Sequence, residues 1–198
     1  MLSQRRATVD RETHETRVRL EINLDGEGLH NIDTGIHFLN HLLGSLALHG
    51  MIDLNIQATG DLKVDDHHVI EDVALALGQA LSLAVGEKKG LKRFGYAVAP
   101  MDDALIMAAV DLSGRFHFES NLEFKRTKIG DLMAEMINHF LKSFAETGRL
   151  NLHIVALRGS NDHHKAEGTF KAVGLALASA VEVNPRLKDR PASEKGVL

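Results

Sequence analysis

Two short segments of the chain are near-copies of one histidine motif. Asp66-His-His-Val-Ile-Glu71 is repeated, 96 residues further along, as Asp162-His-His-Lys-Ala-Glu167. In a helix, residues four apart share a face, so the first histidine and the glutamate of each copy can bind one cation together. A single His-x-x-x-Glu is more often an exposed hydrogen-bonded pair, but here the whole pattern occurs twice. We therefore predict that both copies ligate metal.

The second histidine of each copy, His68 or His164, is rotated by about 100° from the first, so each pair suits two separate metal ions better than one. A second repeated pattern, Asn-His at His41 and His139, adds one histidine to each half. The predicted metal ligands are His41, His67, His68, Glu71, His139, His163, His164 and Glu167. Two metal ions bound by these residues would keep open positions for a substrate. With no cysteine in the chain, the donors suit Mn, Fe, Co, Ni or Zn, and the lack of thiolate favours the harder ions.

Three further residues are candidates for proton transfer. Glu15 and Asp103 occupy equivalent positions 88 residues apart, at the start of paired strands, and are either acid/base groups or simple edge charges. His49 lies two turns beyond His41 on the same side of a predicted helix and can reach the same site. The remaining histidines are expected on solvated faces; they are His14, His30, His117 and His153.

Several cations form a candidate site for an anion such as phosphate. Lys171 and Arg115 stand where the first half has Leu75 and Glu27, so the second half has gained these charges. Together with Arg93 and Lys195 they could bind an anionic group. The plainer interpretation of Lys171 is an ion pair with the glutamate four residues before it.

The motifs belong to a duplicated unit. Between 66–86 and 162–182, ten of 21 positions are identical. Each half is predicted to contain strand, strand, helix, strand and helix. In the first half the strands are expected near 5–13, 15–24 and 51–59 and the helices near 34–49 and 66–86, and the same order follows from 93 to 182.

This order predicts an α+β sandwich made of two homologous halves, each an antiparallel sheet with two helices on one face, packed around a pseudo-two-fold axis. The expected division is a first repeat at 1–90, a second repeat at 91–183 and an irregular C-terminal tail at 184–198.

Composition narrows the function classes. The net charge is −4 and the chain has no tryptophan and one tyrosine, so neither a basic face nor a base-stacking platform for nucleic acid is expected. The first residues contain no apolar signal core, and the most apolar stretch, 73–85, is too short to span a bilayer. We expect a cytoplasmic protein without a membrane or nucleic-acid partner.

Five segments together resemble the imidazoleglycerol-phosphate dehydratase family of histidine biosynthesis. They are Asp33-Thr-Gly-Ile-His-Phe-Leu-Asn-His-Leu-Leu43, Asp66-His-His-Val-Ile-Glu-Asp72, Asn138-His139, Asp162-His-His-Lys-Ala-Glu167 and Ser193-Glu-Lys-Gly196. The resemblance implies a duplicated fold similar to domain 2 of ribosomal protein S5, two Mn²⁺ ions per active site, and an octahedral homo-oligomeric shell of twenty-four subunits with active sites between subunits.

Carried over by position, the resemblance gives the eight ligands above to manganese and places Glu15 and His49 at the substrate. It implies that five residues contact the substrate, mostly its phosphate: Arg93, Arg115, Lys171, Ser193 and Lys195. Glu194 stands between two of these contacts where the family commonly has threonine, and it is counted with the substrate-binding tail. His37 and Asn40 are smaller departures from the family pattern.

The implied reaction converts D-erythro-imidazole glycerol phosphate to imidazole acetol phosphate by loss of water. The substrate would bind the two Mn²⁺ ions as an imidazolate and pass through a diazafulvene-like intermediate, with Glu15 as the proton-transfer group and His49 or Asp103 as alternates. Two other classes remain open at this point: a metal-dependent hydrolase of a small phosphorylated metabolite, and a non-catalytic shell organised by metal.

Overall fold

Alternating apolar residues build one inward-facing side on each sheet. In β2 (Thr16–Asn23) the side chains of Val18, Leu20 and Ile22 are buried, and β6 (Ala104–Asp111) repeats this pattern in the second half. Because side chains alternate between the two faces of a strand, the residues between them face outward. Each sheet therefore offers one apolar face to the helices.

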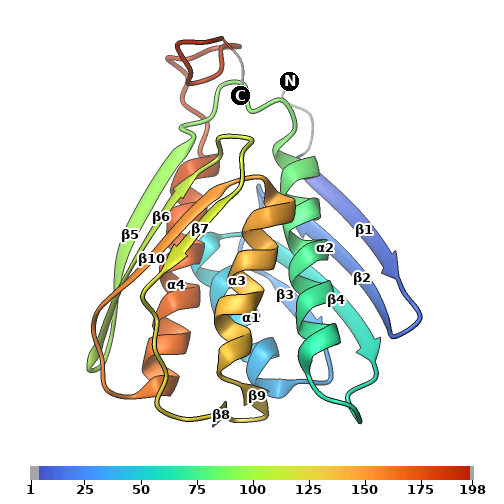
Figure 1. Cartoon of the computed structure of the whole chain (residues 1–198). Coiled ribbons are helices and arrows are strands. Elements are labelled where there is room, and N and C mark those ends of the chain that lie inside the picture. Colours follow the sequence, from blue (N-terminus) through green and yellow to red (C-terminus); the bar gives the residue numbers. More distant parts are fainter. Residues whose placement is uncertain (1–4, 197–198) are drawn as a thin grey trace.

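The computed structural model describes residues 5–196 and contains the same succession of elements twice. The first half comprises β1 (Arg6–Glu12), β2, β3 (His30–Asp33), α1 (His37–Gly50), β4 (Asp53–Gly60) and α2 (His67–Val85). The second half comprises β5 (Phe94–Met101), β6, β7 (His117–Ser120), the short pair β8 (Lys128–Ile129) and β9 (Leu132–Met133), α3 (Glu135–Gly148), β10 (Asn151–Arg158) and α4 (Asp162–Val181). The predicted duplication of α+β halves is confirmed, and the four helices lie between the two four-stranded sheets (Figure 1).

The predicted antiparallel pairing holds for the three longer strands of each sheet but not for the edge strand. The strand orders are β1-β2-β4-β3 and β5-β6-β10-β7, and the last strand of each pairs parallel with its neighbour. Both edge strands, β3 and β7, have only four residues and lack a buried alternating face, so periodicity gave no signal for them. They are parallel because a helix, α1 or α3, carries the chain back before the next strand begins.

The helices of the two halves pack in crossed pairs. Helix α1 packs on α4, and α2 packs on α3, so each contact joins one half to the other. Two repeated glycines allow the close approach: a Cβ on Gly78 would lie 2.2 Å from Thr147 Oγ1 of α3, and one on Gly174 would lie 2.6 Å from the carbonyl oxygen of Leu46 in α1. The halves consequently share one buried core.

Helix α1 begins at His37, three residues later than expected, because polar groups hold the preceding turn. The Asp131 carboxylate, from the turn between β8 and β9, accepts the backbone N–H of His37 at 2.7 Å and of Phe38 at 2.9 Å. These N–H groups have no partner within the helix, so the second half of the chain caps the first helix of the first half.

Helix α2 is long and apolar enough to cross a membrane by length and composition, but most of it is buried in the core. Beyond α4, the described part of the tail runs mostly in turns and bends near the C-terminal ends of α2 and α4 (Figure 1). Two isolated bridges, Leu91 with Val183 and Lys89 with Pro191, attach it to the segment between the halves. The last two residues of the predicted tail, 197–198, lie outside the described residues.

Candidate metal centre

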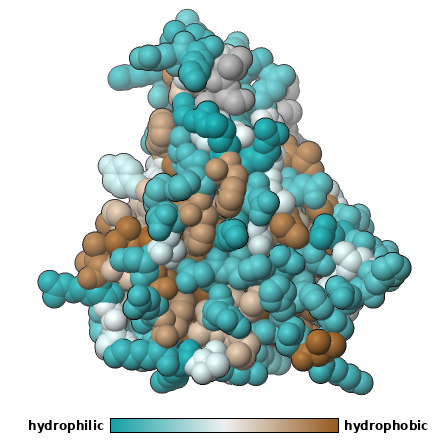
Figure 2. Space-filling model, in the orientation of Figure 1, coloured by the Kyte–Doolittle hydropathy of each residue, from teal (hydrophilic) through white to brown (hydrophobic). Residues whose placement is uncertain are grey.

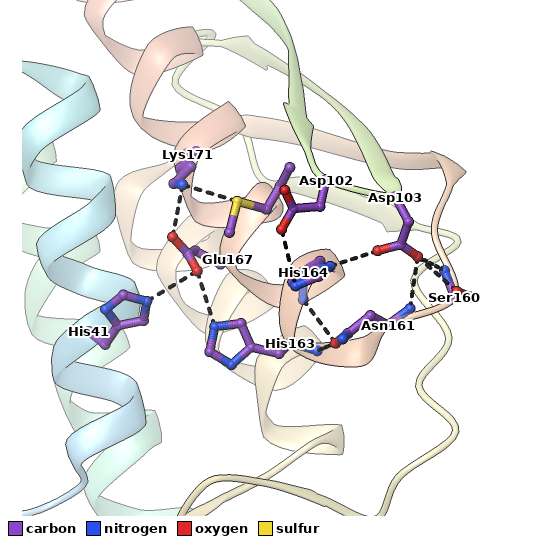
Figure 3. Close-up of polar contacts among 10 residues, drawn as sticks. His41, Asp102, Asp103, Ser160, Asn161, His163, His164, Glu167 and Lys171 are labelled. Atoms are coloured by element: carbon purple, nitrogen blue, oxygen red, sulfur yellow. Dashed lines mark hydrogen bonds and ion pairs between the residues drawn. The ribbon is translucent and has the colours of Figure 1, made fainter.

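The two motifs lie at the first turns of α2 and α4, and each is joined by a histidine from the opposite half. On α4, Glu167 Oε2 lies 3.1 Å from His163 Nε2 and 3.2 Å from Nε2 of His41, which α1 contributes. Figure 3 shows these three side chains pointing toward one another. Their candidate ligand atoms all lie within 4.8 Å of one another, which suits a single shared ion. We call this group the Glu167 cluster.

A matching Glu71 cluster consists of His67, Glu71 and His139. Glu71 Oε1 lies 3.0 Å from His139 Nε2 on α3, and the rings of His67 and His139 are 4.7 Å apart between centroids. The candidate ligand atoms again lie within 4.8 Å of one another. Each cluster therefore combines two residues of one half with one histidine of the other, because α1 packs on α4 and α2 on α3.

The clusters differ in charge and burial. Lys171 Nζ lies 2.8 Å from Glu167 Oε1, as the plainer interpretation of that lysine predicted. Burial acts to raise the pKa of the Glu167 carboxyl, but the hydrogen bonds from Lys171 and His41 outweigh it and hold the pKa at about 2. At the Lys171 position the first half has Leu75, and the Glu71 side chain is 38% exposed against 10% for Glu167. Glu167 is thus an ionised, largely buried oxygen donor.

The second histidine of each motif points elsewhere, as the helical rotation predicted. His68 Nδ1 lies 3.0 Å from Asp61 Oδ2 and 3.7 Å from Glu15 Oε2. The hydrogen bond to Asp61, the largest effect, raises the pKa of His68 above its ordinary value. His68 is therefore grouped with Glu15 and Asp61, three residues whose candidate ligand atoms also lie within 4.8 Å of one another, and not with the Glu71 cluster.

His164 has the equivalent arrangement in the second half. Its Nδ1 lies 2.7 Å from Asp103 Oδ1 and its Nε2 lies 3.4 Å from Asp102 Oδ2 (Figure 3). The backbone N–H of Ser160, then His164, then the backbone N–H of Asn161 donate to Asp103 and hold its pKa well below the usual range. Asp103 is therefore a firmly held anion.

The candidate anion-binding residues are not together within one chain. Lys171 belongs to the Glu167 cluster, whereas Ser193, Glu194 and Lys195 lie in the tail beyond the other end of α4. From Glu167 to its end at Val181, α4 rises about 21 Å, which separates the tail from the cluster. Arg115 lies exposed in the loop between β6 and β7.

Arg93 lies beside the tail, but its guanidinium is largely engaged. Its Nε and one terminal nitrogen donate to the Asp111 carboxylate at 2.6 and 3.0 Å, and the other terminal nitrogen donates to the carbonyl oxygen of Ala192 at 2.8 Å. The side chain is 14% exposed. Arg93 therefore fixes the start of the segment that carries Ser193 and Lys195.

Comparison with known proteins identifies the family. A family model described as imidazoleglycerol-phosphate dehydratase matches residues 34–177, which is well over half of the chain. This chain belongs to the imidazoleglycerol-phosphate dehydratase family. The imidazoleglycerol-phosphate dehydratase of Granulibacter bethesdensis is 50% identical over 194 residues, covering 98% of this chain and 99% of that protein. That of Methanothermobacter thermautotrophicus is 49% identical over 183 residues, covering 92% of this chain and 94% of the relative.

Solved dehydratases share the fold. The crystal structure of the Staphylococcus aureus enzyme has a TM-score of 0.82 at 34% identity and covers 90% of this chain and 99% of its own. The Pyrococcus furiosus structure, in complex with (S)-C348, has a TM-score of 0.81 at 35% identity and covers 96% and 100%. The predicted family and fold class are confirmed, and the chain is a hydro-lyase of histidine biosynthesis that acts on a phosphorylated imidazole.

Two of the three acid/base candidates of this dehydratase lie beside the motifs. Glu15, in the turn between β1 and β2, is next to His68, and Asp103, in the turn between β5 and β6, is next to His164. His49 lies in the last turn of α1, two turns beyond His41, and makes no hydrogen bond or ion pair with either cluster among the described residues. The structure therefore groups Glu15 and Asp103 with the motifs and leaves His49 apart.

Three aspartates that the sequence analysis did not select support the dehydratase motifs. Asp162 accepts the backbone N–H groups of Lys125 and Arg126 at 2.9 and 2.8 Å, and Asp66 accepts that of Met133 at 2.7 Å. Asp61 lies against His68. The signal for Asp66 and Asp162 was present, since both begin the repeated motif, but their partners lie in loops far away in sequence.

Proposed function

We propose that the dehydratase reaction of this chain depends on two divalent cations, with Mn²⁺ as the native ion, and that the Glu71 and Glu167 clusters are their binding sites. The observation that carries this proposal is the pair of equivalent clusters, each with two imidazoles and one carboxylate whose ligand atoms lie within 4.8 Å of one another. The donors fit: they are nitrogen and oxygen, there is no thiolate, and Glu167 is ionised over the whole neutral range.

Each cluster supplies three donors, so an ion held there has room for a further ligand and for substrate. His68 and His164 are the two remaining histidines of the motifs, and neither reaches a cluster in its own chain. We assign them to the ions of neighbouring chains. This assignment also accounts for the separation of about 21 Å along α4 between Glu167 and the end of the helix, where the tail begins, since a second chain can bring its own tail to that site.

The reaction removes the hydroxyl from the carbon beside the imidazole ring and a proton from the next carbon along the chain, and that proton is hardly acidic. When bound, the cations supply Lewis acidity to the azole and to the neighbouring hydroxyl. The protein supplies the base. Glu15 fits this role because its side chain is 55% exposed, is carried on a tight turn, and lies at the motif beside His68. The enol left after loss of water then tautomerises to the ketone, imidazole acetol phosphate.

The proposed role of the positively charged side chains is to bind the phosphate of the substrate. Lys171 lies at the Glu167 cluster, and Arg93, Ser193, Glu194 and Lys195 are gathered at the tail. Arg115 is exposed in its loop and free of ion pairs among the described residues. We propose that Lys171 of one chain and the tail of another contact the same phosphate, with Arg93 positioning that tail through Ala192.

This arrangement requires association of several chains. We propose the octahedral shell of twenty-four subunits that the family resemblance implies, with the active sites between subunits, in the cytoplasm. The mostly buried course of α2 is in keeping with a protein that does not span a membrane.

The direct test is incubation of the Mn²⁺-loaded protein with imidazole glycerol phosphate, followed by detection of the keto product. The proposal predicts imidazole acetol phosphate, no release of inorganic phosphate, and loss of turnover after chelation that Mn²⁺ restores. Phosphate release from ordinary esters would indicate a hydrolase instead. Metal binding without any product would indicate a non-catalytic shell.

A further inference from the structure

A buried carboxylate that the proposed mechanism does not use lies one helical turn beyond His68 on α2. This residue, Asp72, is 6% exposed. Its Oδ1 accepts a hydrogen bond from Nε of Arg11 in β1 at 2.7 Å, and its Oδ2 accepts one from the hydroxyl of Thr16 at the start of β2. Arg11 compensates the buried negative charge. The bond to Thr16 leads in another direction, to the turn that carries Glu15.

Hydrogen bonds continue from Thr16 to the backbone of Glu15. Thr13 Oγ1 lies 3.1 Å from Thr16 Oγ1 and accepts the backbone N–H of Glu15 at 3.1 Å and that of Thr16 at 3.0 Å. A hydroxyl has one proton and two lone pairs, so the two N–H groups use both lone pairs of Thr13, and its proton is donated to Thr16. Thr16 then donates its own proton to Asp72, because a carboxylate can only accept. Every bond of this network is therefore directed toward Asp72.

The turn between β1 and β2 depends on such bonds for its conformation. Thr13, His14 and Glu15 are exposed, so packing does not hold the tip of the turn. Figure 2 shows mostly hydrophilic residues on the flank that carries β1 and β2, at the right of the view. Two-residue turns between antiparallel strands favour positive φ, and neither His14 nor Glu15 has it. The hydrogen bonds of Thr13 and Thr16 thus stabilise a turn that backbone preference alone does not favour.

The equivalent turn of the second half is held in a different way. There Asp102 has a positive φ of 47°, and Ser160 and Asn161 donate to Asp103 from the other side. The equivalents of the network residues carry no hydroxyl, carboxylate or guanidinium. In place of Arg11, Thr13, Thr16 and Asp72 they are Ala99, Met101, Ala104 and Gly168. The fold therefore does not require the network, and only the half that carries the proposed base has it.

We infer that Asp72 is a positioning residue for the dehydratase reaction, and that it acts through Thr16 and Thr13 to fix the turn that presents Glu15 beside His68. The inference rests on the proposed function, in which Glu15 is the base. Asp72 and His68 are four residues apart on α2, so one helix fixes both the base and this proposed metal ligand. Precise placement matters, because a displacement of about 1 Å can cost about 10²-fold in rate.

The test separates the hydroxyl of Thr16 from the packing of its side chain. Thr16→Val keeps the shape and removes the hydroxyl, whereas Thr16→Ser keeps the hydroxyl and removes a buried methyl group. Both variants should lose stability. We expect only Thr16→Val to lose turnover, with kcat lower by about tenfold and KM within about twofold of the wild type. Thr16→Ser should keep kcat within about twofold, which a purely structural role of Thr16 does not predict.

Asp72→Asn is the second variant. The side-chain amide replaces one carboxylate oxygen by an N–H donor, so either Arg11 or Thr16 then faces a donor instead of an acceptor. This variant should lower kcat as Thr16→Val does. Circular dichroism verifies that each variant is folded, and the assay uses Mn²⁺-loaded protein with imidazole glycerol phosphate.

A double-variant cycle shows whether Thr16 acts through Glu15. When Glu15→Gln has already removed the base, Thr16→Val should lower kcat no further, because there is no base left to position. Two effects that multiply would overturn the inference. Normal kcat in folded Thr16→Val and Asp72→Asn would overturn it as well.

Hydrogen exchange provides a readout that does not depend on turnover. In substrate-free protein, the backbone N–H groups of Glu15 and Thr16 should exchange at least about fivefold faster in Thr16→Val and Asp72→Asn than in the wild type and Thr16→Ser, the effect of one lost hydrogen bond. If exchange accelerates in this way while Glu15→Gln keeps near-normal turnover, the network stands and the base assigned in the proposed function is wrong. If Glu15→Gln is impaired while exchange and kcat of Thr16→Val are unchanged, the base stands and the inference is wrong.

Discussion

At the residue scale, the two halves give equivalent carboxylates different surroundings. Asp103 accepts hydrogen bonds from Ser160, Asn161 and His164, which hold its pKa well below the usual range. A carboxylate stabilised in this way is a poor proton acceptor. Glu15, at the equivalent position, makes one ion pair among the described residues, with His68 at 3.7 Å. The comparison favours Glu15 as the base and gives Asp103 a supporting role.

The first prediction follows from this contrast. Glu15→Gln should lower kcat by about 10²-fold or more, since general-base catalysis contributes on that order, with metal content and thermal stability unchanged. Asp103→Asn should lower stability, because the turn at Ser160 and Asn161 loses its acceptor charge. Steady-state kinetics, metal analysis and thermal unfolding of both variants check this. Near-normal turnover by Glu15→Gln would remove Glu15 from the mechanism.

The second prediction concerns pH and the unfolding of metal-free protein. The pKa of Glu167 is about 2 when folded, below its ordinary value of 4.5, so its contribution to stability is present above about pH 4.5 and is lost as pH falls toward 2. Lys171→Leu, which copies Leu75, removes a hydrogen bond that lowers this pKa. The variant should therefore lose free energy of unfolding at pH 7 and show a smaller difference between pH 7 and pH 3. Equal pH profiles from urea unfolding would contradict this.

The residues of the two clusters could be selected from sequence because helical spacing and duplication are local properties. The supporting aspartates could not. Asp61 reaches His68 only because the loop after β4 folds back over the start of α2, and Asp131 caps α1 from a turn 94 residues beyond His37. Such contacts depend on the positions of loops in the folded chain, and the spacing of residues in the sequence does not predict those positions.

At the element scale, the crossed packing of the helices forms the clusters. Periodicity predicts four helices and the long strands. It does not say which helices pack against each other, because the apolar stripe of a helix can be buried against more than one partner. Gly78 and Gly174 mark the observed pairing, because each lies where a neighbouring helix approaches too closely for a side chain. The edge strands β3 and β7 were not predicted, because each has only four residues and no alternating buried face that periodicity could detect.

The third prediction is that Gly78→Ala destabilises the protein by about 1–3 kcal/mol through overpacking, because its Cβ would lie 2.3 Å from the carbonyl oxygen of Phe144. Gly168→Ala is the matched control, since its Cβ would meet only side-chain atoms, the nearest being Ile106 Cγ1 at 3.2 Å and Met101 Cβ at 3.4 Å. Alanine has the higher helix propensity, by about 1 kcal/mol, so the control should be close to neutral. Urea unfolding measures both. Equal effects would mean that the α2–α3 approach does not limit the residue size.

At the scale of the whole molecule, one chain holds the parts of the proposed dehydratase site at separate places. The clusters lie at the N-terminal ends of α2 and α4, and the tail lies at their C-terminal ends (Figure 1). In the proposed assembly, different ends of different chains come together. Because imidazole ligands must be neutral to bind metal, association through metal should weaken as pH falls through the histidine range.

The fourth prediction follows for the assembly. Metal-loaded protein at pH 8 should sediment as a large species, and chelation, or acidification to about pH 5.5, should reduce it to a smaller one. Analytical ultracentrifugation with and without chelator measures the change, and readdition of Mn²⁺ at pH 8 should restore the large species. A sedimentation coefficient that does not respond to chelator would argue against metal-linked association.

The most direct test of the central claim is the number of Mn²⁺ ions bound per chain, measured together with turnover. The wild type should bind two ions per chain and lose activity when they are removed, whereas Glu71→Ala and Glu167→Ala should each retain one ion at saturating Mn²⁺, because the clusters are separate. A metal-free wild type that still converts imidazole glycerol phosphate at the full rate would contradict the account, as would an ion count unaffected by either substitution.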